Sequence, residues 1–267
     1  MRQDEGSSVA GLSLALPSAG PDPIPVDVAV AAVLGYARGR RPLRFRSPGQ
    51  PAGSWVQVPA FGYERFDCLP VDAQAPGDAD VLVAEGLHGR LDPQGWAAVH
   101  GALDRVSTLA TAAVHRAAGR TFWELPDDEL SVLGEPGTVG AALREIWTRC
   151  ARAPDVRPEF VSAALHHRQP ALMPHLDRTT RRQMLPHMVE SDSGVEAVIH
   201  RELRGNPAGF AALEMATAAL LGREGDVPLT RLRLHDILVW LSGSLRLTHA
   251  LQLGHATAEW AEYAAGR

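Results

Sequence analysis

The sequence predicts an all-α fold, with about ten helices packed in one bundle. From residue 78 onward, apolar residues recur three and four positions apart, which is the spacing of an amphipathic helix. Capping signals mark where helices begin, and Gly or Pro residues separate one periodic stretch from the next. No repeat of fixed period is present, and a chain of 267 residues is long enough to bury one large core.

The N-terminal region differs in composition from the rest of the chain. Residues 1–25 are rich in Ser, Gly and Pro, and we expect a disordered leader before a single helical domain over residues 26–267. Acidic residues lie beside the first arginine, which argues against a signal peptide. Apolar spacing predicts a first helix over residues 26–38. Alternation around a Pro/Gly turn in residues 43–62 then indicates a small β-hairpin, with an irregular loop as the alternative.

Start signals place most of the later helices. Asp92 followed by Pro93 is a capping acid with proline at the first helical position. Ser193 and Glu196 have the spacing of a capping box, and Asn206-Pro207 opens another helix. The helices expected after the hairpin span residues 78–87, 93–118, 125–133, 138–152, 159–167, 178–184, 193–204, 206–221 and 230–264, the last one interrupted near Gly243 or Gly254.

The composition excludes several kinds of chemistry. The chain has no lysine, so all 26 basic side chains are arginine. An imine-forming lysine, an internal aldimine of pyridoxal phosphate and the lysine of a phosphate-binding loop are therefore unavailable. Cys68 and Cys150 form neither a CxxC pair nor a disulfide framework, so we expect no structural zinc site. We expect no cofactor.

Charge and hydropathy indicate the kind of partner. The net charge of −5 weighs against avid binding to nucleic acid, because phosphate neutralisation needs a surplus of basic groups. No apolar run reaches the roughly 18 residues that span a bilayer. We therefore expect no membrane contact, and nucleic acid is disfavoured as a partner. The two unpaired cysteines are typical of a cytoplasmic protein.

The most distinctive stretch is residues 153–178, APDVRPEFVSAALHHRQPALMPHLDR. A proline-bracketed turn leads into a short helix with a histidine pair, and a second proline turn delivers Asp177 just before another helix. This layout resembles the helix-hairpin-helix DNA glycosylases, in which a proline turn presents a catalytic aspartate. The resemblance is strong over this stretch and diffuse over residues 60–245, and it implies a glycosylase-like helical bundle.

Two departures from the glycosylase pattern change the reaction that the resemblance implies. Asp155-Val156-Arg157 stands where that family has Gly-Val-Gly, and an aspartate there would repel a DNA phosphate. Glu159 stands where the bifunctional members place their lysine nucleophile, which leaves only the monofunctional, aspartate-assisted mode. Residues 79–87 and 231–241 also resemble an uncharacterised high-GC bacterial family with the same layout.

Asp177 is the first candidate for a catalytic carboxylate. In the family that the chain resembles, the equivalent acid stabilises positive charge as a leaving group departs, or activates a nucleophile. The alternative is that Asp177 caps the helix that begins at Arg178, with Thr180 at the third position, and both roles can coexist. His175 is the candidate proton carrier beside it.

Arg178, Arg181 and Arg182 are candidates for binding an anionic group of the substrate. They lie on roughly one face of the helix that begins at Arg178, near its positive end. Guanidinium groups suit the oxygens of phosphate or sulfate. The alternative is a solvated basic face that pairs with nearby acids.

Three further side chains are candidates for substrate binding. Asp80 and Glu85 lie on a helix that lines the cleft in the family resembled, where a carboxylate would position a cation; the alternatives are a helix cap and a solvent-facing acid. His166 is included as a second proton carrier, because adjacent histidines point about 100° apart on a helix and do not share a metal. Asp236 lies in an apolar stretch, and we predict an arginine partner for it.

Three functions stay open at this point. The first is a small-molecule enzyme of secondary metabolism that performs a carboxylate-assisted displacement or ring closure with loss of an anionic group. For this function the chain is similar to the aziridine-forming enzymes of azabicycle antibiotic biosynthesis, which close a ring by expelling sulfate. The second is a divergent monofunctional DNA glycosylase. The third is a non-catalytic nucleic-acid-binding module in which Asp177 only caps a helix.

Overall fold

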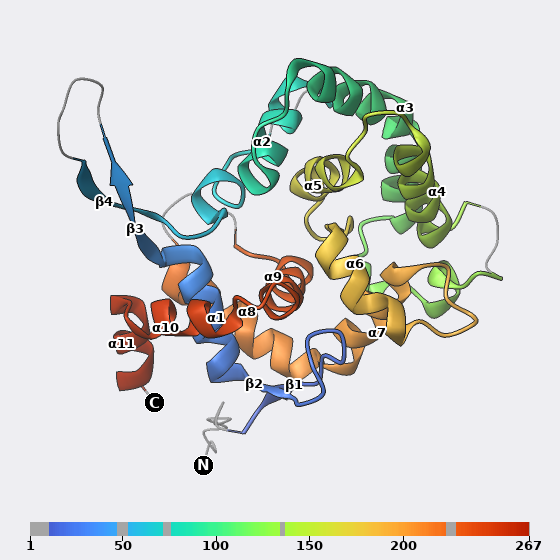
Figure 1. Ribbon diagram of the computed structural model, residues 1–267. Helices are drawn as coiled ribbons and strands as arrows, with labels where there is room; N and C mark the ends of the chain where they lie inside the picture. The colour runs from blue at the N-terminus through green and yellow to red at the C-terminus, as the bar shows by residue number, and fades with distance from the viewer. Residues whose placement is uncertain (1–10, 47–52, 72–75, 134–136, 223–227, 267) are drawn as a thin grey trace, which may run out of the picture.

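The computed structural model describes residues 11–46, 53–71, 76–133, 137–222 and 228–266. Within these ranges, eleven α-helices and two short two-stranded sheets form a mostly helical bundle, which confirms the predicted fold class (Figure 1). The helices are α1 (Val26–Arg38), α2 (Asp78–His88), α3 (Pro93–Ala117), α4 (Val139–Arg152), α5 (Pro158–Arg168), α6 (Arg178–Met184), α7 (Val195–Gly205), α8 (Pro207–Leu221), α9 (Arg231–Gly243), α10 (Leu247–His255) and α11 (Ala258–Ala265).

Helix α9 lies at the centre of the molecule, between two groups of helices (Figure 1). It contacts α1, α8 and α10 of one group and α6 and α7 of the other, while α2, α3, α4 and α5 pack on one another. Nearly all residues of α9 are buried, which is expected of a helix that is apolar on most sides. The same helix also buries Arg233, His235 and Asp236, and these polar groups need partners inside the protein.

The structure differs from the disordered leader expected over residues 1–25. Residues 1–10 lie outside the described residues, but β1 (Ser13–Leu14) pairs antiparallel with β2 (Ile24–Pro25). Leu14, Leu16 and Ser18 alternate with exposed neighbours and are buried against the bundle. This alternation with period two is typical of a β-strand. The sequence analysis missed it because the segment is rich in Ser and Pro.

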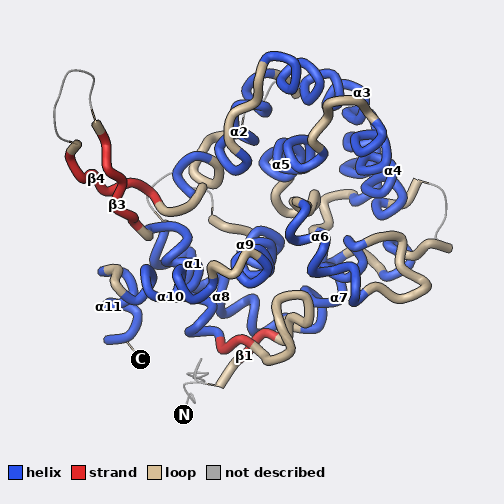
Figure 2. Tube along the Cα trace, viewed as in Figure 1, coloured by secondary structure: helices blue, strands red, loops and turns tan. Residues whose placement is uncertain are grey.

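The predicted hairpin is present and projects from the body of the protein (Figure 2). Strand β3 (Arg40–Phe45) pairs antiparallel with β4 (Ser54–Pro59), so the hairpin begins three residues earlier than the expected range of 43–62. Phe45 and Trp55 are exposed near its outer end, at 51% and 69%.

Two predicted helices differ from the structure. Residues 125–133 contain only a 3₁₀ turn, Asp127–Leu130, where an α-helix was expected. The long stretch 230–264 is divided into α9, α10 and α11, with breaks after Gly243 and just beyond Gly254, as the glycines indicated. Across the described ranges, no helix has both the length and the apolar composition needed to cross a bilayer.

Candidate active site

A pocket lies against one side of α9, between α1 and α2. Its empty volume is about 420 Å³, open solvent included. The turn between α5 and α6 supplies His175 and Asp177, so the two residues that the sequence suggested as catalytic line the same pocket. The other residues that line it are Tyr36, Gly62, Leu87, His88, Arg233, Asp236, Ile237 and Trp240.

Asp177 caps α6, as one of the two interpretations of the sequence predicted, and it also lines the pocket. Its Oδ1 accepts hydrogen bonds from the backbone N–H of Thr180 at 2.7 Å and from the Thr180 hydroxyl at 3.1 Å. The backbone N–H of Asp177 donates in return to the Thr180 hydroxyl at 3.0 Å, which completes the N-cap of α6. The side chain is buried and lines the pocket. The capping bonds therefore hold a carboxylate at the pocket wall.

Asp236 of α9 holds His175 in place. The Nδ1 of His175 donates to Oδ2 of Asp236 at 2.9 Å, and Arg233 donates a short hydrogen bond to the same oxygen. Arg233 is the arginine partner that the sequence predicted for Asp236. Burial by itself raises the pKa of Asp236, but His175 and Arg233 outweigh burial and bring that pKa well below its usual range. The Asp236 side chain is therefore an ionised carboxylate, which can only accept hydrogen bonds.

Arg233 also pairs with a second acid, Asp67. Its Nε donates to Oδ1 of Asp67 at 2.6 Å, and its Nη2 donates to the Tyr36 hydroxyl at 2.8 Å. The Tyr36 hydroxyl donates to Oδ2 of Asp67 at 2.8 Å, and burial raises the pKa of Tyr36 well above its usual value. The pocket is thus lined by two carboxylates, those of Asp177 and Asp236, and by one guanidinium, that of Arg233, which is shared with Asp67 outside the pocket.

His88, the last residue of α2, is a pocket residue that the sequence analysis missed. Its Nε2 lies 3.1 Å from Nε2 of His175, and its ring packs on those of His175 and Phe160. Burial, and then the neighbouring His175, lower the pKa of His88 to about 3, so its imidazole is neutral near pH 7. A histidine at a helix C-terminus is common for local reasons, and its partner lies 87 residues away. No local pattern could identify this residue.

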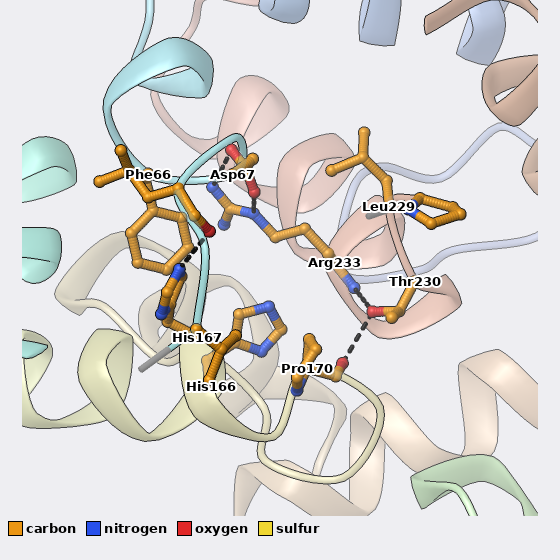
Figure 3. A pocket seen from close by; sticks show the side chains of 11 residues that line it. Phe66, Asp67, His166, His167, Pro170, Leu229, Thr230 and Arg233 are labelled. Carbon is orange, nitrogen blue, oxygen red and sulfur yellow. Dashed lines mark hydrogen bonds and ion pairs between the residues drawn. The ribbon is translucent and has the colours of Figure 1, made fainter. Parts of the chain in front are cut away.

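His166 lies in a second pocket, which shares Arg233 with the Asp177 pocket (Figure 3). Its Nδ1 donates to the Met173 carbonyl at 2.6 Å, and its ring stacks on Phe66. Burial, and then Arg233, lower the pKa of His166 to about 3. Its ring centre is 6.4 Å from that of His175, but His166 does not line the Asp177 pocket. The predicted role of His166 in binding the substrate of that pocket is therefore not supported.

Asp80 and Glu85 accept hydrogen bonds from backbone N–H groups near the ends of α2 and do not line the pocket. Asp80 accepts a hydrogen bond from the Gly77 N–H at 2.8 Å and pairs with Arg168 at 3.1 Å. Glu85 accepts a hydrogen bond from the Leu91 N–H at 2.7 Å. Helix α2 does reach the pocket, as expected, but only its last turn does so, through Leu87 and His88.

The three arginines of α6 lie outside the pocket. Arg178 and Arg182 are exposed, and Arg181 stacks on Trp147 with its guanidinium carbon 4.2 Å from the ring centre. The buried face of α6 is formed by Thr180 and Met184, so the arginines occupy its outer faces. These side chains do not form the predicted anion clamp beside Asp177.

The turn between α4 and α5 bears on DNA binding. Asp155 has a φ of +58°, which is the left-handed region where the glycosylase resemblance expects glycine. Its carboxylate accepts a hydrogen bond from the Gln94 side chain at 2.7 Å. Arg157 lies over the Phe160 ring and 3.6 Å from the carboxylate of Glu159. An acid, Asp155, therefore stands at the left-handed position of this turn, and a second acid, Glu159, lies beside Arg157.

Among the described residues, no group of three His, Cys, Asp or Glu side chains is placed to hold a metal ion. Comparisons with protein-family models, with curated proteins and with solved structures find no match. The function therefore has to be inferred from the side chains of the pocket.

Proposed function

We propose that the protein is a small-molecule enzyme that closes a ring by carboxylate-assisted displacement, with Asp177 at the reacting centre. The observation that carries this proposal is the buried Asp177 carboxylate, fixed by Thr180 in a pocket where acids outnumber the one arginine. Fixed negative charge in a pocket of this kind stabilises positive charge that develops on a substrate. A DNA duplex would need the opposite arrangement, a basic groove.

The reaction that fits this charge is the displacement of sulfate from a β-amino sulfate ester, which yields an aziridine. The lone pair of the amine forms the new N–C bond while the C–O bond breaks and its electron pair leaves with the sulfate. The nitrogen becomes positively charged as the ring closes, and Asp177 stabilises that charge. A base of the pocket takes the proton that the substrate ammonium must lose before its nitrogen can attack, and the aziridinium ion that forms loses its extra proton to solvent. Because the arginines of α6 lie outside the pocket, we assign them no part in this step.

The substitution Asp177→Asn tests this proposal. Asparagine is as good an N-cap as aspartate, so the variant keeps the start of α6 and removes only the charge. We expect kcat/KM for sulfate release to fall roughly 10²-fold or more, because a charged group at the reacting centre is lost. The measurement is ion chromatography of sulfate released from 2-aminoethyl hydrogen sulfate or a larger β-amino sulfate ester.

Thr180→Ala is the matched control. This variant loses the two hydrogen bonds of the Thr180 hydroxyl, so it should melt at a lower temperature. The backbone N–H of residue 180 still holds the Asp177 carboxylate, so turnover should be retained. Equal turnover in Asp177→Asn and in the Thr180 variant would show that Asp177 is only a helix cap.

The glycosylase alternative predicts a different result. A mobility shift with duplex DNA that contains an abasic site, run at moderate salt, should show no retained complex if the proposal is correct. Strong binding together with release of a damaged base would replace the proposed function with a divergent glycosylase. Strong binding without base release would indicate the nucleic-acid-binding module.

A further inference from the structure

Three side chains from separate parts of the chain form a line of hydrogen bonds into the Asp177 pocket. His88 comes from the end of α2, His175 from the turn before α6, and Asp236 from the middle of α9. The Nε2 atoms of the two histidines are 3.1 Å apart, and Nδ1 of His175 is 2.9 Å from Oδ2 of Asp236. All three residues line the pocket together with Asp177.

We propose that His88, His175 and Asp236 form a proton relay, in which His88 accepts the proton of a substrate amine bound in the Asp177 pocket. This inference rests on the proposed function, because it names the base and the kind of group that reacts there. The substrate class that follows is a small compound with a basic amine, held as its ammonium form until the relay removes one proton.

The carboxylate of Asp236 determines which ring nitrogens of His175 and His88 carry protons. Because an ionised carboxylate only accepts, His175 must present N–H at Nδ1. The two facing Nε2 atoms of His88 and His175 then share one proton, since a hydrogen bond needs one donor and one acceptor. In the resting state, His88 donates from Nε2, and its Nδ1 carries a lone pair that can accept a proton.

The relay explains how a buried histidine can act as a base. A positive charge on His88 itself is disfavoured by burial, by His175, and by Arg233 and Arg157. When a proton arrives at Nδ1, however, the proton on Nε2 can pass to Nε2 of His175. The positive charge then rests on His175, where the hydrogen-bonded carboxylate of Asp236 stabilises it. His88 is left neutral, with its proton moved from one nitrogen to the other.

The charges around the pocket favour an amine as the proton donor. Two carboxylates, those of Asp177 and Asp236, line the pocket, and the one guanidinium that lines it, that of Arg233, is already bound to Asp236 and to Asp67 outside the pocket. A small ammonium group would reduce this surplus of negative charge on binding. Loss of one proton to His88 frees the lone pair that attacks carbon, so the relay activates the nucleophile of the proposed ring closure. The ring closes as an aziridinium ion, and its extra proton is lost to solvent after release.

His88→Gln tests the relay, and His166→Asn is its matched control. Glutamine at 88 can still hydrogen-bond to His175 but cannot pass a proton on. Asparagine at 166 removes another buried imidazole, from the neighbouring pocket, while it can still donate to the Met173 carbonyl. We expect His88→Gln to lower kcat for sulfate release roughly 10²-fold with little change in KM, and to remove the acidic limb of the pH–rate profile. The control His166→Asn should keep the wild-type kcat and the acidic limb.

A second measurement separates failure of the relay from failure of the proposed reaction. In ¹⁵N-labelled protein, the shared proton predicts a scalar coupling across the hydrogen bond between the Nε2 atoms of His88 and His175, and its loss in His88→Gln. Wild-type protein without sulfate release but with this coupling would refute the ring closure and retain the relay. No coupling, or turnover of His88→Gln equal to that of His166→Asn, would overturn the relay even if Asp177→Asn is inactive.

Discussion

Outside the pocket, a second buried cluster holds the N-terminal segment on α7 and α9. Glu202 accepts hydrogen bonds from the Ser18 N–H at 2.8 Å, from the Ser18 hydroxyl at 2.6 Å and from Nε2 of His235 at 2.6 Å. Burial by itself raises the pKa of Glu202, but His235 and Ser18 outweigh burial and lower it. Glu202 is thus an ionised acid that binds three donors, two of them from the N-terminal segment.

Glu202→Gln should destabilise the protein by about 3 kcal/mol or more, because a buried carboxylate that accepts three hydrogen bonds is replaced by an amide whose N–H meets other donors. The folded pKa of Glu202 lies below its unfolded value of about 4.3. Its stabilising effect is therefore complete above that pH and is lost as pH falls through the folded pKa. Urea unfolding at pH 7 and pH 3 should show a difference between variant and wild type that shrinks in acid.

The ion pair of Glu214 and Arg231 provides the control for that prediction. Its atoms lie 2.9 Å apart, but the Glu214 side chain is more exposed, at 27%. Glu214→Gln should therefore change stability by about 1 kcal/mol or less. An effect of Glu202→Gln no larger than that of Glu214→Gln would contradict a stabilising role for the buried cluster.

Sequence reasoning found part of the candidate site. Asp177 and His175 were identified because they follow a proline turn and precede a helix, which are local features. Asp236 was assigned only a structural role, although its need for an arginine was foreseen. Tyr36 and His88 were missed because their partners lie 197 and 87 residues away in the chain. Contacts of that separation depend on how the helices pack, which local patterns do not specify.

At the scale of elements, the crossing of α1 and α10 depends on two glycines. A Cβ at Gly35 would lie 1.8 Å from the Ala250 carbonyl oxygen, and one at Gly254 would lie 1.8 Å from the Ala31 carbonyl oxygen. Both clashes are with backbone atoms, so a side-chain rotation does not relieve them. The two helices can approach this closely only because both positions lack a Cβ.

Gly35→Ala should therefore force α10 away from α1 and destabilise the protein by about 3 kcal/mol or more, in the range of severe overpacking. Gly101→Ala in α3 is the control, since its Cβ would meet only the end of the Arg105 side chain at 3.3 Å. Alanine there should stabilise α3 by about 0.5–1 kcal/mol. Thermal unfolding should show a lower melting temperature for Gly35→Ala and a higher one for Gly101→Ala. Changes in the same direction would contradict this explanation of the crossing.

The elements themselves were mostly predictable from local patterns. The start of α3 at Pro93 follows from the Asp92 cap, whose carboxylate accepts a hydrogen bond from the Gly95 N–H at 2.7 Å. The N-terminal strands were missed because Leu14 and Leu16 are buried by distant helices, not by their neighbours in sequence. The close crossing of α1 and α10 could not be predicted either. Nothing in the sequence indicates that the helix with Gly35 packs on the helix with Gly254.

At the scale of the whole molecule, buried neutral histidines make the fold sensitive to mild acid. Burial is the main cause that lowers the pKa of His88, His166 and His200, to about 3 for the first two. The unfolded chain binds their protons with a pKa of about 6.5, so it holds more protons than the folded protein below that pH. Their contribution to stability is therefore present above pH 6.5 and is lost as pH falls toward the folded pKa.

The expected result is a free energy of unfolding that decreases between about pH 6 and pH 4.5, before the carboxylates titrate. Each of these histidines contributes a slope of up to about 1.4 kcal/mol per pH unit. His166→Asn should reduce the slope by the contribution of one histidine. The control is His115→Gln, which removes an exposed imidazole and should leave the slope unchanged. Urea unfolding at half-unit pH steps measures the slope. A slope that His166→Asn leaves unchanged would mean that this imidazole is not neutral in the folded protein, which would contradict the pKa that burial and Arg233 give it.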